Sequence, residues 1–253
     1  MRKLVARWVK NFLRRRGYRL IRADANNSLE SFMFHIIEQR PLTFVQIGAN
    51  DGHSADPLYE FVTFHHARVR GLVVEPVEDY FDELVQTYRG YPSIVPVRAA
   101  IHRTKKEMTI YRPRPGKRLR KGIASFDPDH YRRFGIDPAD IVAEKVRCMT
   151  LDELLDEHGI RQLDVLQIDT EGYDAEIVRG IRFDRVRPGI IRFEHGYRAN
   201  LMTPATHREL TRLLHAQGYE IVIERRDTTA YLPEIMLGEA AAVFPLRERT
   251  SYA

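Results

Sequence analysis

Four side chains that could carry acid–base chemistry stand directly after two short apolar segments, residues 163–168 and 189–193. They are Asp169, Glu171, Glu194 and His195. Both segments read as buried strands, and the carboxyl ends of parallel strands meet at one edge of a sheet. We therefore expect three carboxylates and an imidazole to converge there as catalytic groups. Such a base can take the proton from a hydroxyl nucleophile, and an imidazole titrates in the suitable range.

The same residues permit two other interpretations. An acid at the end of a strand can serve the start of the next helix, and Glu171 and Asp174 both stand where the predicted helix 174–179 begins. The cluster could also hold a divalent cation through its carboxylates. Because the residues do not show the tight spacing of a metal-binding motif, the sequence predicts no metal site.

A turn of small residues forms a second candidate site. Residues 45–52 read VQIGANDG and lead from an apolar strand into a predicted helix. Small residues let the backbone approach a ligand here, and Asn50 tolerates the left-handed conformation. Glu75, at the end of the next predicted strand and 23 residues past Gly52, is placed to accept hydrogen bonds from both ribose hydroxyls of an adenosine. The predicted cofactor-binding residues are Gln46, Gly48, Asn50, Asp51, Gly52, Glu75, Pro76 and Asp169.

The turn favours S-adenosylmethionine over a nicotinamide cofactor. A nicotinamide site prefers Gly-x-Gly-x-x-Gly, which brings a helix N-terminus to the pyrophosphate. Here the third glycine is missing and Asp51 stands where phosphate would lie. An acid beside phosphate is unfavourable, whereas a positively charged sulfonium tolerates it.

Alternating strands and helices must position these residues. The alternation predicts an α/β domain over residues 41–253, with a mostly parallel sheet and helices on both faces. The predicted helices are 29–40, 56–65, 79–88, 150–158, 174–179 and 204–217, and the predicted strands are 42–47, 71–74, 94–97, 108–111, 163–168, 189–193, 219–223 and 240–244. Residues 112–148 show no regular pattern. Within them, 112–133 carries eight basic residues, which suits either a mobile lid over the acceptor or a solvated loop.

The chain resembles the FkbM family of methyltransferases. The matching segments are FVQIGANDG (44–52), VEP (74–76), TLDEL (150–154), DVLQIDTEGYD (164–174) and RPGIIRFEH (187–195). The resemblance implies a Rossmann-like class I methyltransferase fold, a doubly wound seven-stranded sheet with an antiparallel last strand. It also implies S-adenosylmethionine-dependent transfer of a methyl group to a hydroxyl, often on a sugar, glycan or secondary metabolite. Gln46 departs from the pattern, because many relatives carry an acid there.

Two other functions fit the same sheet. One is an NAD(P)-dependent Rossmann-type oxidoreductase, although the sequence contains no Tyr-x-x-x-Lys pair. The other is a non-catalytic relative that binds S-adenosylmethionine without turnover. The presence of all the expected site residues argues against a non-catalytic relative; they are Gly48, Gly52, Glu75, Asp169 and Glu171.

The charge is concentrated at the N-terminus. The net charge is +5, but residues 1–22 hold nine basic residues and no acid, which leaves 31 basic and 35 acidic residues elsewhere. A nucleic-acid-binding fold would carry its basic face across the domain, so we expect no nucleic-acid partner. The single cysteine allows no internal disulfide, and a cytoplasmic location is expected.

Residues 1–40 are predicted to form a basic, amphipathic helical extension. The residues at positions 4, 5, 8, 9, 12 and 13 are apolar and share one helical face. A cationic helix of this kind can lie on the inner face of an anionic membrane, or its apolar face can pack on the domain or on a second copy in a homodimer.

The membrane interpretation predicts that the intact chain binds anionic vesicles more strongly than a variant beginning at Ala23. Each basic residue near an anionic leaflet contributes about 1 kcal/mol, so the difference should shrink as salt is added. Sedimentation with liposomes measures it. Equal partitioning of both proteins would leave residues 1–22 as a packing or dimer element.

Overall fold

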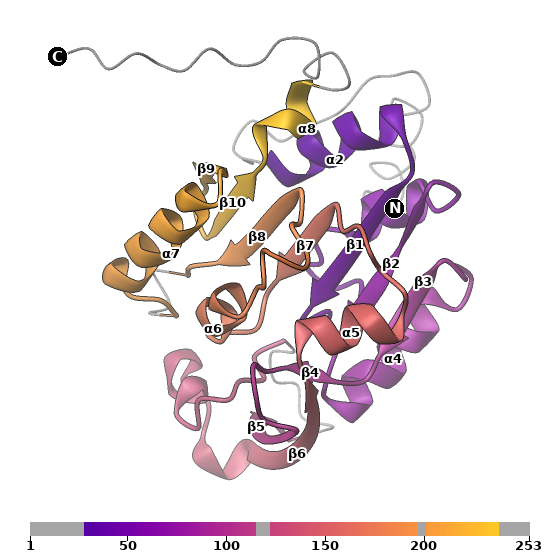
Figure 1. The fold of residues 1–253 in the computed structure, drawn as a ribbon. Coiled ribbons are helices and arrows are strands. Elements are labelled where there is room, and N and C mark those ends of the chain that lie inside the picture. Colours follow the sequence, from indigo (N-terminus) through magenta and orange to yellow (C-terminus); the bar gives the residue numbers. More distant parts are fainter. Residues whose placement is uncertain (1–27, 115–121, 197–200, 238–253) are drawn as a thin grey trace, which may run out of the picture.

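A seven-stranded sheet forms the centre of the computed structural model, which describes residues 28–114, 122–196 and 201–237 (Figure 1). Its strands are β1 (Leu42–Ile47), β2 (Val69–Val74), β3 (Ile94–Val97), β7 (Val165–Ile168), β8 (Ile190–Glu194), β9 (Glu220–Ile223) and β10 (Asp227–Tyr231). Their spatial order is β3-β2-β1-β7-β8-β10-β9. The first five strands are parallel, and β10 runs antiparallel to both neighbours. This order confirms the predicted doubly wound sheet with an antiparallel last strand.

Helices cover both faces of this sheet. They are α2 (Ser28–Gln39), α3 (Tyr59–Phe64), α4 (Glu78–Tyr88), α5 (Leu151–Glu157), α6 (Asp174–Arg179), α7 (Pro204–Ala216) and α8 (Pro233–Leu237). Residues of α2, α3 and α4 share one hydrophobic cluster with the sheet, and residues of α5, α6 and α7 share a second. Thr150 caps α5 through a capping box with Glu153.

A small second sheet lies beyond the carboxyl edge of the central sheet (Figure 1). It contains β4 (Ala100–Ile101), β5 (Glu107–Pro113) and β6 (Ile141–Met149), with two short 3₁₀ helices, His130–Phe134 and Pro138–Asp140, between β5 and β6. The sequence predicted no strand at β6. Exposed Lys145 and Arg147 alternate there with buried Val146 and Cys148, and their charge obscured the apolar alternation.

The antiparallel strand is not where the sequence placed it. The structure forms it from Asp227–Tyr231, whereas the predicted strand 240–244 lies outside the described residues. Its interior residues include Thr228 and Thr229, which are fully buried. The Thr228 hydroxyl forms hydrogen bonds with the His195 and His207 rings. A polar segment can therefore form a buried strand, and a search for apolar runs does not find it.

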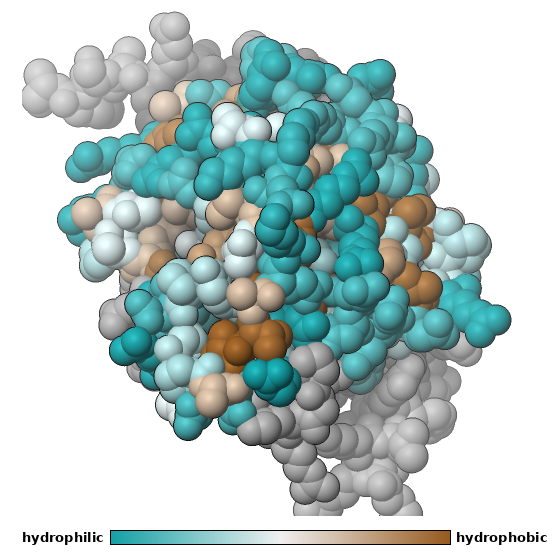
Figure 2. All heavy atoms as spheres, turned by 90° about the horizontal axis from the view of Figure 1, so that it is seen from below, coloured by the Kyte–Doolittle hydropathy of each residue, from teal (hydrophilic) through white to brown (hydrophobic). Residues whose placement is uncertain are grey.

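The predicted helix within residues 1–22 also lies outside the described residues. Within the described ranges, no helix has both the length and the apolarity needed to cross a bilayer. Seen from the end that carries the small sheet, the described surface is mostly hydrophilic, with apolar areas set between polar ones (Figure 2).

One face of the central sheet changes from apolar to polar along the strands. Phe44, Val165 and Ile190 are register partners on β1, β7 and β8, and all three are buried in the cluster that α2 covers. Two residues further along each strand, the register partners are Gln46, Gln167 and Arg192. The carboxyl third of the sheet therefore presents polar groups where a closed core would present apolar ones.

Asp174 ties together the ends of the two strands that carry the acidic residues. One carboxylate oxygen accepts from the Glu194 backbone N–H at 2.9 Å, and the other accepts from the Thr170 hydroxyl at 2.6 Å and its N–H at 3.2 Å. Asp174 is 1% exposed. Its carboxylate fixes the spacing of the β7 and β8 ends rather than facing a ligand.

Replacing Asp174 with alanine should lower the free energy of unfolding by about 2–3 kcal/mol, because buried donors would lose their acceptor. Urea denaturation measures the change. Asp184→Ala is the matched control, since Asp184 is exposed and forms a surface ion pair with Arg182. A loss no larger than that of the control would show that Asp174 does not hold the edge together.

Candidate active site

The loop after β1 packs directly against the end of β7. Gly48 has φ +81°, and a Cβ at this position would lie 1.8 Å from the carbonyl oxygen of Asp169, so only glycine fits. Asn50 also has a positive φ, +48°, as its predicted left-handed role requires. The backbone N–H of Asn50 donates to the Glu75 carboxylate at 2.9 Å. This contact joins the loop to the end of β2.

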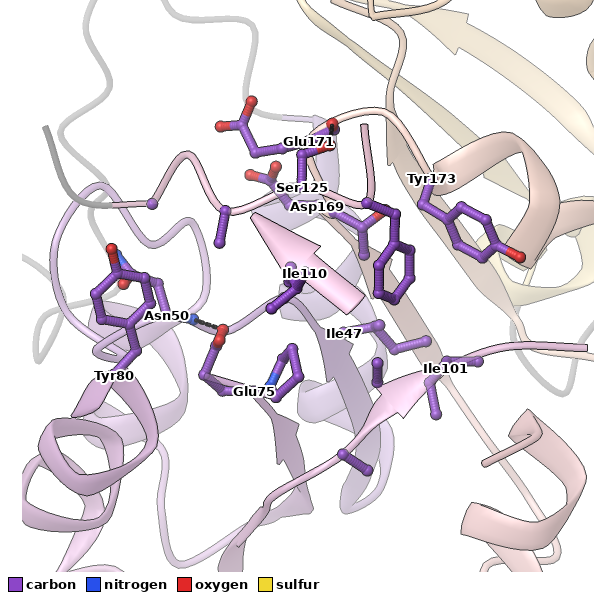
Figure 3. Close-up of a pocket in the computed structure, with 18 residues that line it drawn as sticks. Ile47, Asn50, Glu75, Tyr80, Ile101, Ile110, Ser125, Asp169, Glu171 and Tyr173 are labelled. Atoms are coloured by element: carbon purple, nitrogen blue, oxygen red, sulfur yellow. Dashed lines mark hydrogen bonds between the residues drawn. The ribbon is translucent and has the colours of Figure 1, made fainter. Parts of the chain in front are cut away.

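Glu75 is buried beneath this loop with two backbone donors. Besides Asn50, the Val77 N–H donates to its other carboxylate oxygen at 3.0 Å. Burial raises the pKa of Glu75 to about 7, against the lowering effect of these two bonds. Figure 3 shows the carboxylate at the wall of a cavity, with the Asn50 bond drawn.

This first cavity opens to solvent and has largely apolar walls. The apolar residues include Ile47, Pro76, Ala99, Ile101, Ile110 and Phe126. Polar groups lie at its ends, with Glu75 and Asn50 on one side and Asp169 and Glu171 on the other (Figure 3). An apolar slot with a few directed polar groups suits a nucleoside, whose base is flat and whose ribose carries hydroxyls.

A second, more polar cavity adjoins the first. The two share Gly48, Asn50, Gly122, Asp169 and Glu171. The remaining polar lining comes from Gln46, Ser54, Asp56, Gln167, Arg192, Glu194, Arg226 and Asp227. Asp169 and Glu171 therefore stand where an apolar slot meets a space lined by groups of both charges.

Three of the four predicted catalytic residues converge at this junction. Carboxylate oxygens of Asp169, Glu171 and Glu194 lie within 4.8 Å of one another. Burial and the neighbouring Glu194 raise the pKa of Asp169 well above its usual range. Burial and then Glu171 raise the pKa of Glu194 to about 7, although Arg226 opposes the shift.

This convergence also revises the expectation about metals. The sequence predicted no metal site because the acids do not show the tight spacing of a metal-binding motif. In the structure their oxygens could surround one hard cation. A proton bound by one of the carboxylates would also reduce their mutual repulsion. The cluster could therefore hold either a cation or a proton.

His195 is not at this junction. Its ring is 1% exposed, bonds to the Thr228 hydroxyl at 3.1 Å and packs 5.0 Å from the His207 ring. It lines neither cavity, and burial lowers its pKa. Side chains alternate along a strand, so Glu194 and His195 point to different sides. The structure therefore separates the imidazole from the carboxylates.

Two predicted cofactor residues shape the loop instead of facing a cavity. The Asp51 carboxylate accepts from the backbone N–H groups of His53 at 3.0 Å and Ser54 at 2.7 Å. A Cβ on Gly52 would lie 2.5 Å from Leu84 and 2.7 Å from Tyr88, both of α4. The other predicted cofactor residues line one or both cavities.

A segment between β5 and β6 contributes contacts that the sequence did not indicate. The Ser125 hydroxyl donates to the Glu171 carbonyl at 2.9 Å, and His130 Nε2 lies 3.2 Å from the Glu171 carboxylate. Arg133 donates to His130 Nδ1 at 3.0 Å. His130 lies in a stretch without a regular sequence pattern, so its contact with Glu171 could not be predicted from the sequence.

The basic stretch 112–133 is partly used in internal ion pairs. Arg112 is almost fully buried between Asp79 and Glu144, and Arg133 pairs with Asp127. The predicted role of residues 115–121 falls outside the described residues.

Comparison with known proteins identifies the family. A model of the FkbM methyltransferase domain matches residues 46–221. No match was found among curated proteins. Similar solved structures include an Aeropyrum pernix fibrillarin with natively bound S-adenosyl-L-methionine. It shows 15% sequence identity, and the match covers 90% of this chain and 73% of that chain with a TM-score of 0.40. A precorrin-6y C5,15-methyltransferase from Geobacter metallireducens shows 13% identity over 84% of this chain and 92% of that chain, with TM-score 0.41.

A methyltransferase from Geobacter sulfurreducens shows 12% identity over 90% of this chain and 87% of that chain, with TM-score 0.41. These likenesses are too remote to carry a functional argument. The domain match, in contrast, spans well over half of the chain and includes the glycine loop, Glu75 and the three converging carboxylates. The chain belongs to the FkbM family of S-adenosylmethionine-dependent methyltransferases.

Proposed function

We propose that this methyltransferase methylates a hydroxyl group, on a sugar, a glycan or a hydroxyl-rich secondary metabolite. The observation that carries the proposal is the convergence of Asp169, Glu171 and Glu194 where the two cavities meet. An alcohol needs a base before it can attack a methyl group, and carboxylates supply one. The family match also removes the nicotinamide-dependent oxidoreductase as an alternative.

The first cavity fits the nucleoside of S-adenosylmethionine. An ionised carboxylate has about four acceptor positions, and Glu75 uses two of them on backbone donors. Two remain for the ribose hydroxyls, while the apolar walls suit the adenine ring. Gly48 provides the close backbone approach at the junction. When bound, the cofactor supplies an electrophilic methyl group on a sulfonium.

The acidic pair Asp169 and Glu171 is assigned the role of proton acceptor. Both residues line both cavities, so a hydroxyl entering from the polar side meets them at the junction. As the acceptor oxygen bonds to the methyl carbon, the carbon–sulfur bond breaks and the hydroxyl proton passes to a carboxylate. The products are a methyl ether and S-adenosylhomocysteine. Glu171 is held for this role at φ +52° by the contacts of Ser125 and His130.

The second cavity supports a hydroxyl-rich acceptor. Its lining offers carboxylates, amides and guanidinium groups together. Each sugar hydroxyl both donates and accepts a hydrogen bond, so a mixed lining of this kind matches it. A purely apolar acceptor would leave these groups without partners at a cost of about 1–3 kcal/mol each.

Glu75→Ala should weaken S-adenosylhomocysteine binding about 10- to 150-fold, since hydrogen bonds to a charged group are worth about 1.5–3 kcal/mol. Isothermal titration calorimetry measures the affinity. Glu107→Gln, which alters an exposed acid on β5, should leave it unchanged. Wild-type affinity in Glu75→Ala would remove Glu75 from the cofactor site.

Cofactor affinity should also depend on pH through Glu75. Its pKa is raised to about 7, and the ribose hydroxyls need the ionised carboxylate. Binding should therefore be strongest above pH 7 and weaken as the pH falls, by about tenfold between pH 8 and pH 6. Glu75→Gln carries no titrating group, so calorimetry on that variant should show a flatter profile. An unchanged profile in the variant would assign the pH dependence elsewhere.

Glu171→Gln and Asp169→Asn should each lower methyl transfer about 100-fold or more, the usual worth of a general base. The assay uses labelled S-adenosylmethionine with extracted glycan and lipid pools, and calorimetry should show that Glu171→Gln still binds S-adenosylhomocysteine. His195→Gln should retain activity. Near-wild-type rates in both acid variants would contradict the base assignment, and inhibition by EDTA that magnesium reverses would assign the cluster to a cation.

A further inference from the structure

A buried imidazole lies beside one of the carboxylates assigned as proton acceptor. His130 is 1% exposed, and its ring packs 5.2 Å from the ring of Phe134. Its Nε2 atom lies 3.2 Å from the Glu171 carboxylate. His130 lines neither cavity, so any influence of this ring on the reaction must pass through Glu171.

Arg133 determines which nitrogen of the His130 ring carries the proton. Its Nη1 atom donates to His130 Nδ1 at 3.0 Å. A guanidinium group has donors only and keeps its proton in proteins, so Nδ1 must be the acceptor of this bond. In the neutral ring the proton therefore stands on Nε2, the nitrogen that faces Glu171.

The turn that precedes His130 holds both ends of this arrangement. Arg133 Nη2 donates to the Asp127 carboxylate at 3.1 Å, and the Asp127 backbone N–H donates to the Ser125 hydroxyl at 3.2 Å. The same hydroxyl donates to the Glu171 carbonyl at 2.9 Å, and Figure 3 shows the two residues side by side. One chain of contacts therefore reaches the Glu171 carboxylate through His130, and a second reaches its carbonyl through Ser125.

Glu171 depends on such contacts because its own backbone is unfavourable. It is a non-glycine residue at φ +52°, a conformation that persists only where the surroundings impose it. The Nε2–H of His130 is not aligned with the carboxylate oxygen 3.2 Å away, so the described residues leave this buried donor without a hydrogen bond. Because a buried donor without an acceptor is costly, a small rotation of the carboxylate toward Nε2 is favourable.

We propose that His130 is a positioning residue for methyl transfer, which Arg133 fixes as the Nε2–H tautomer so that it holds the Glu171 carboxylate where the two cavities meet. The inference rests on the proposed role of Glu171 as proton acceptor. A carboxylate held through Oε2 keeps Oε1 for the hydroxyl of the acceptor. Arg133 and Asp127 thereby influence the rate, although neither lines a cavity.

The first test separates the two ends of the His130 ring. Glutamine brings an amide NH₂ to the place of Nε2, where it can donate to Glu171, whereas asparagine reaches only as far as Nδ1 and can serve Arg133 alone. His130→Leu and His130→Asn should lower the rate at saturating S-adenosylmethionine about 10- to 100-fold. His130→Gln should recover most of it. The assay follows labelled methyl transfer to extracted glycan and lipid pools.

Binding of the cofactor should not change in these variants. The KM for S-adenosylmethionine and the calorimetric affinity for S-adenosylhomocysteine should match the wild type, because His130 lies outside the first cavity. Melting temperatures measured by circular dichroism show whether each variant folds. Losses of rate that only follow the melting temperatures, or equal rates in His130→Gln and His130→Asn, would overturn the positioning role. The glutamine–asparagine pair decides even where His130→Leu does not fold.

The second test removes the control of the tautomer from the surface. Arg133→Met keeps the aliphatic stem and loses every donor, so the ring can turn an unprotonated nitrogen toward Glu171. The rate should fall about tenfold, which corresponds to the loss of one hydrogen bond. Arg161→Met, at another exposed arginine that pairs with an aspartate, is the matched control and should keep the wild-type rate. A wild-type rate in Arg133→Met would contradict the tautomer assignment.

A double variant distinguishes failure of this proposal from failure of the proposed function. In the Glu171→Gln background, His130→Leu should cause little further loss, because the two side chains act as one unit. A slow Glu171→Gln together with a wild-type rate in His130→Leu would overturn the positioning role and leave the base assignment intact. A wild-type rate in Glu171→Gln would overturn the assignment of Glu171 and the positioning role with it.

Discussion

The site depends on the contact between Gly48 and the Asp169 carbonyl. Because a Cβ at position 48 would lie 1.8 Å from that oxygen, the β1 loop can close on β7 only with glycine there. The same approach brings the loop after β1 against the acidic cluster. It also makes the two cavities adjoin, since both are bounded by Gly48 and Asp169. One steric constraint therefore couples the cavity proposed for the cofactor to the carboxylates proposed as the base.

Repulsion among buried carboxylates distinguishes the carboxyl edge of the sheet from the rest of the sheet. Asp169, Glu171 and Glu194 converge with only Arg226 and His130 as direct partners among the described residues, and neutral amides and Arg192 lie beneath them. Unpaired buried groups of this kind cost stability. The Asp174 carboxylate accepts hydrogen bonds from the ends of two strands and holds them in place. This keeps the converging acids from spreading apart. This loss of stability is concentrated at the position where a bound cationic cofactor and an acceptor that donates a proton would offset it.

The sequence predicted the fold well where periodicity and composition agree. The strands beside Gly48, Glu75, Asp169 and Glu194 were predicted because each has an apolar run that a small or acidic residue follows. β6 and β10 were missed because charged or hydroxyl side chains interrupt their pattern. Local patterns report burial by apolar side chains, and they do not report polar groups that are buried with a partner.

The site was predicted in outline but not in its details. Chain order placed Glu194 and His195 together, yet the alternation of a strand sends them to opposite sides, a consequence that could have been drawn from the sequence. Gln167 and Arg192 were visible as polar residues inside apolar strands, but their shared register needs the sheet pairing. His130 approaches Glu171 across 41 residues of chain through a segment without regular pattern, and only the folded chain shows that contact.

The central claim is that the carboxyl edge of the sheet binds S-adenosylmethionine with its ribose at Glu75 and its reactive end at the acidic cluster. A crystal structure of the complex with S-adenosylhomocysteine tests this most directly. We expect both ribose hydroxyls within hydrogen-bond distance of the Glu75 carboxylate, and the sulfur beside Asp169 and Glu171. A ligand bound with its ribose away from Glu75, or with its sulfur remote from the three carboxylates, would contradict the account.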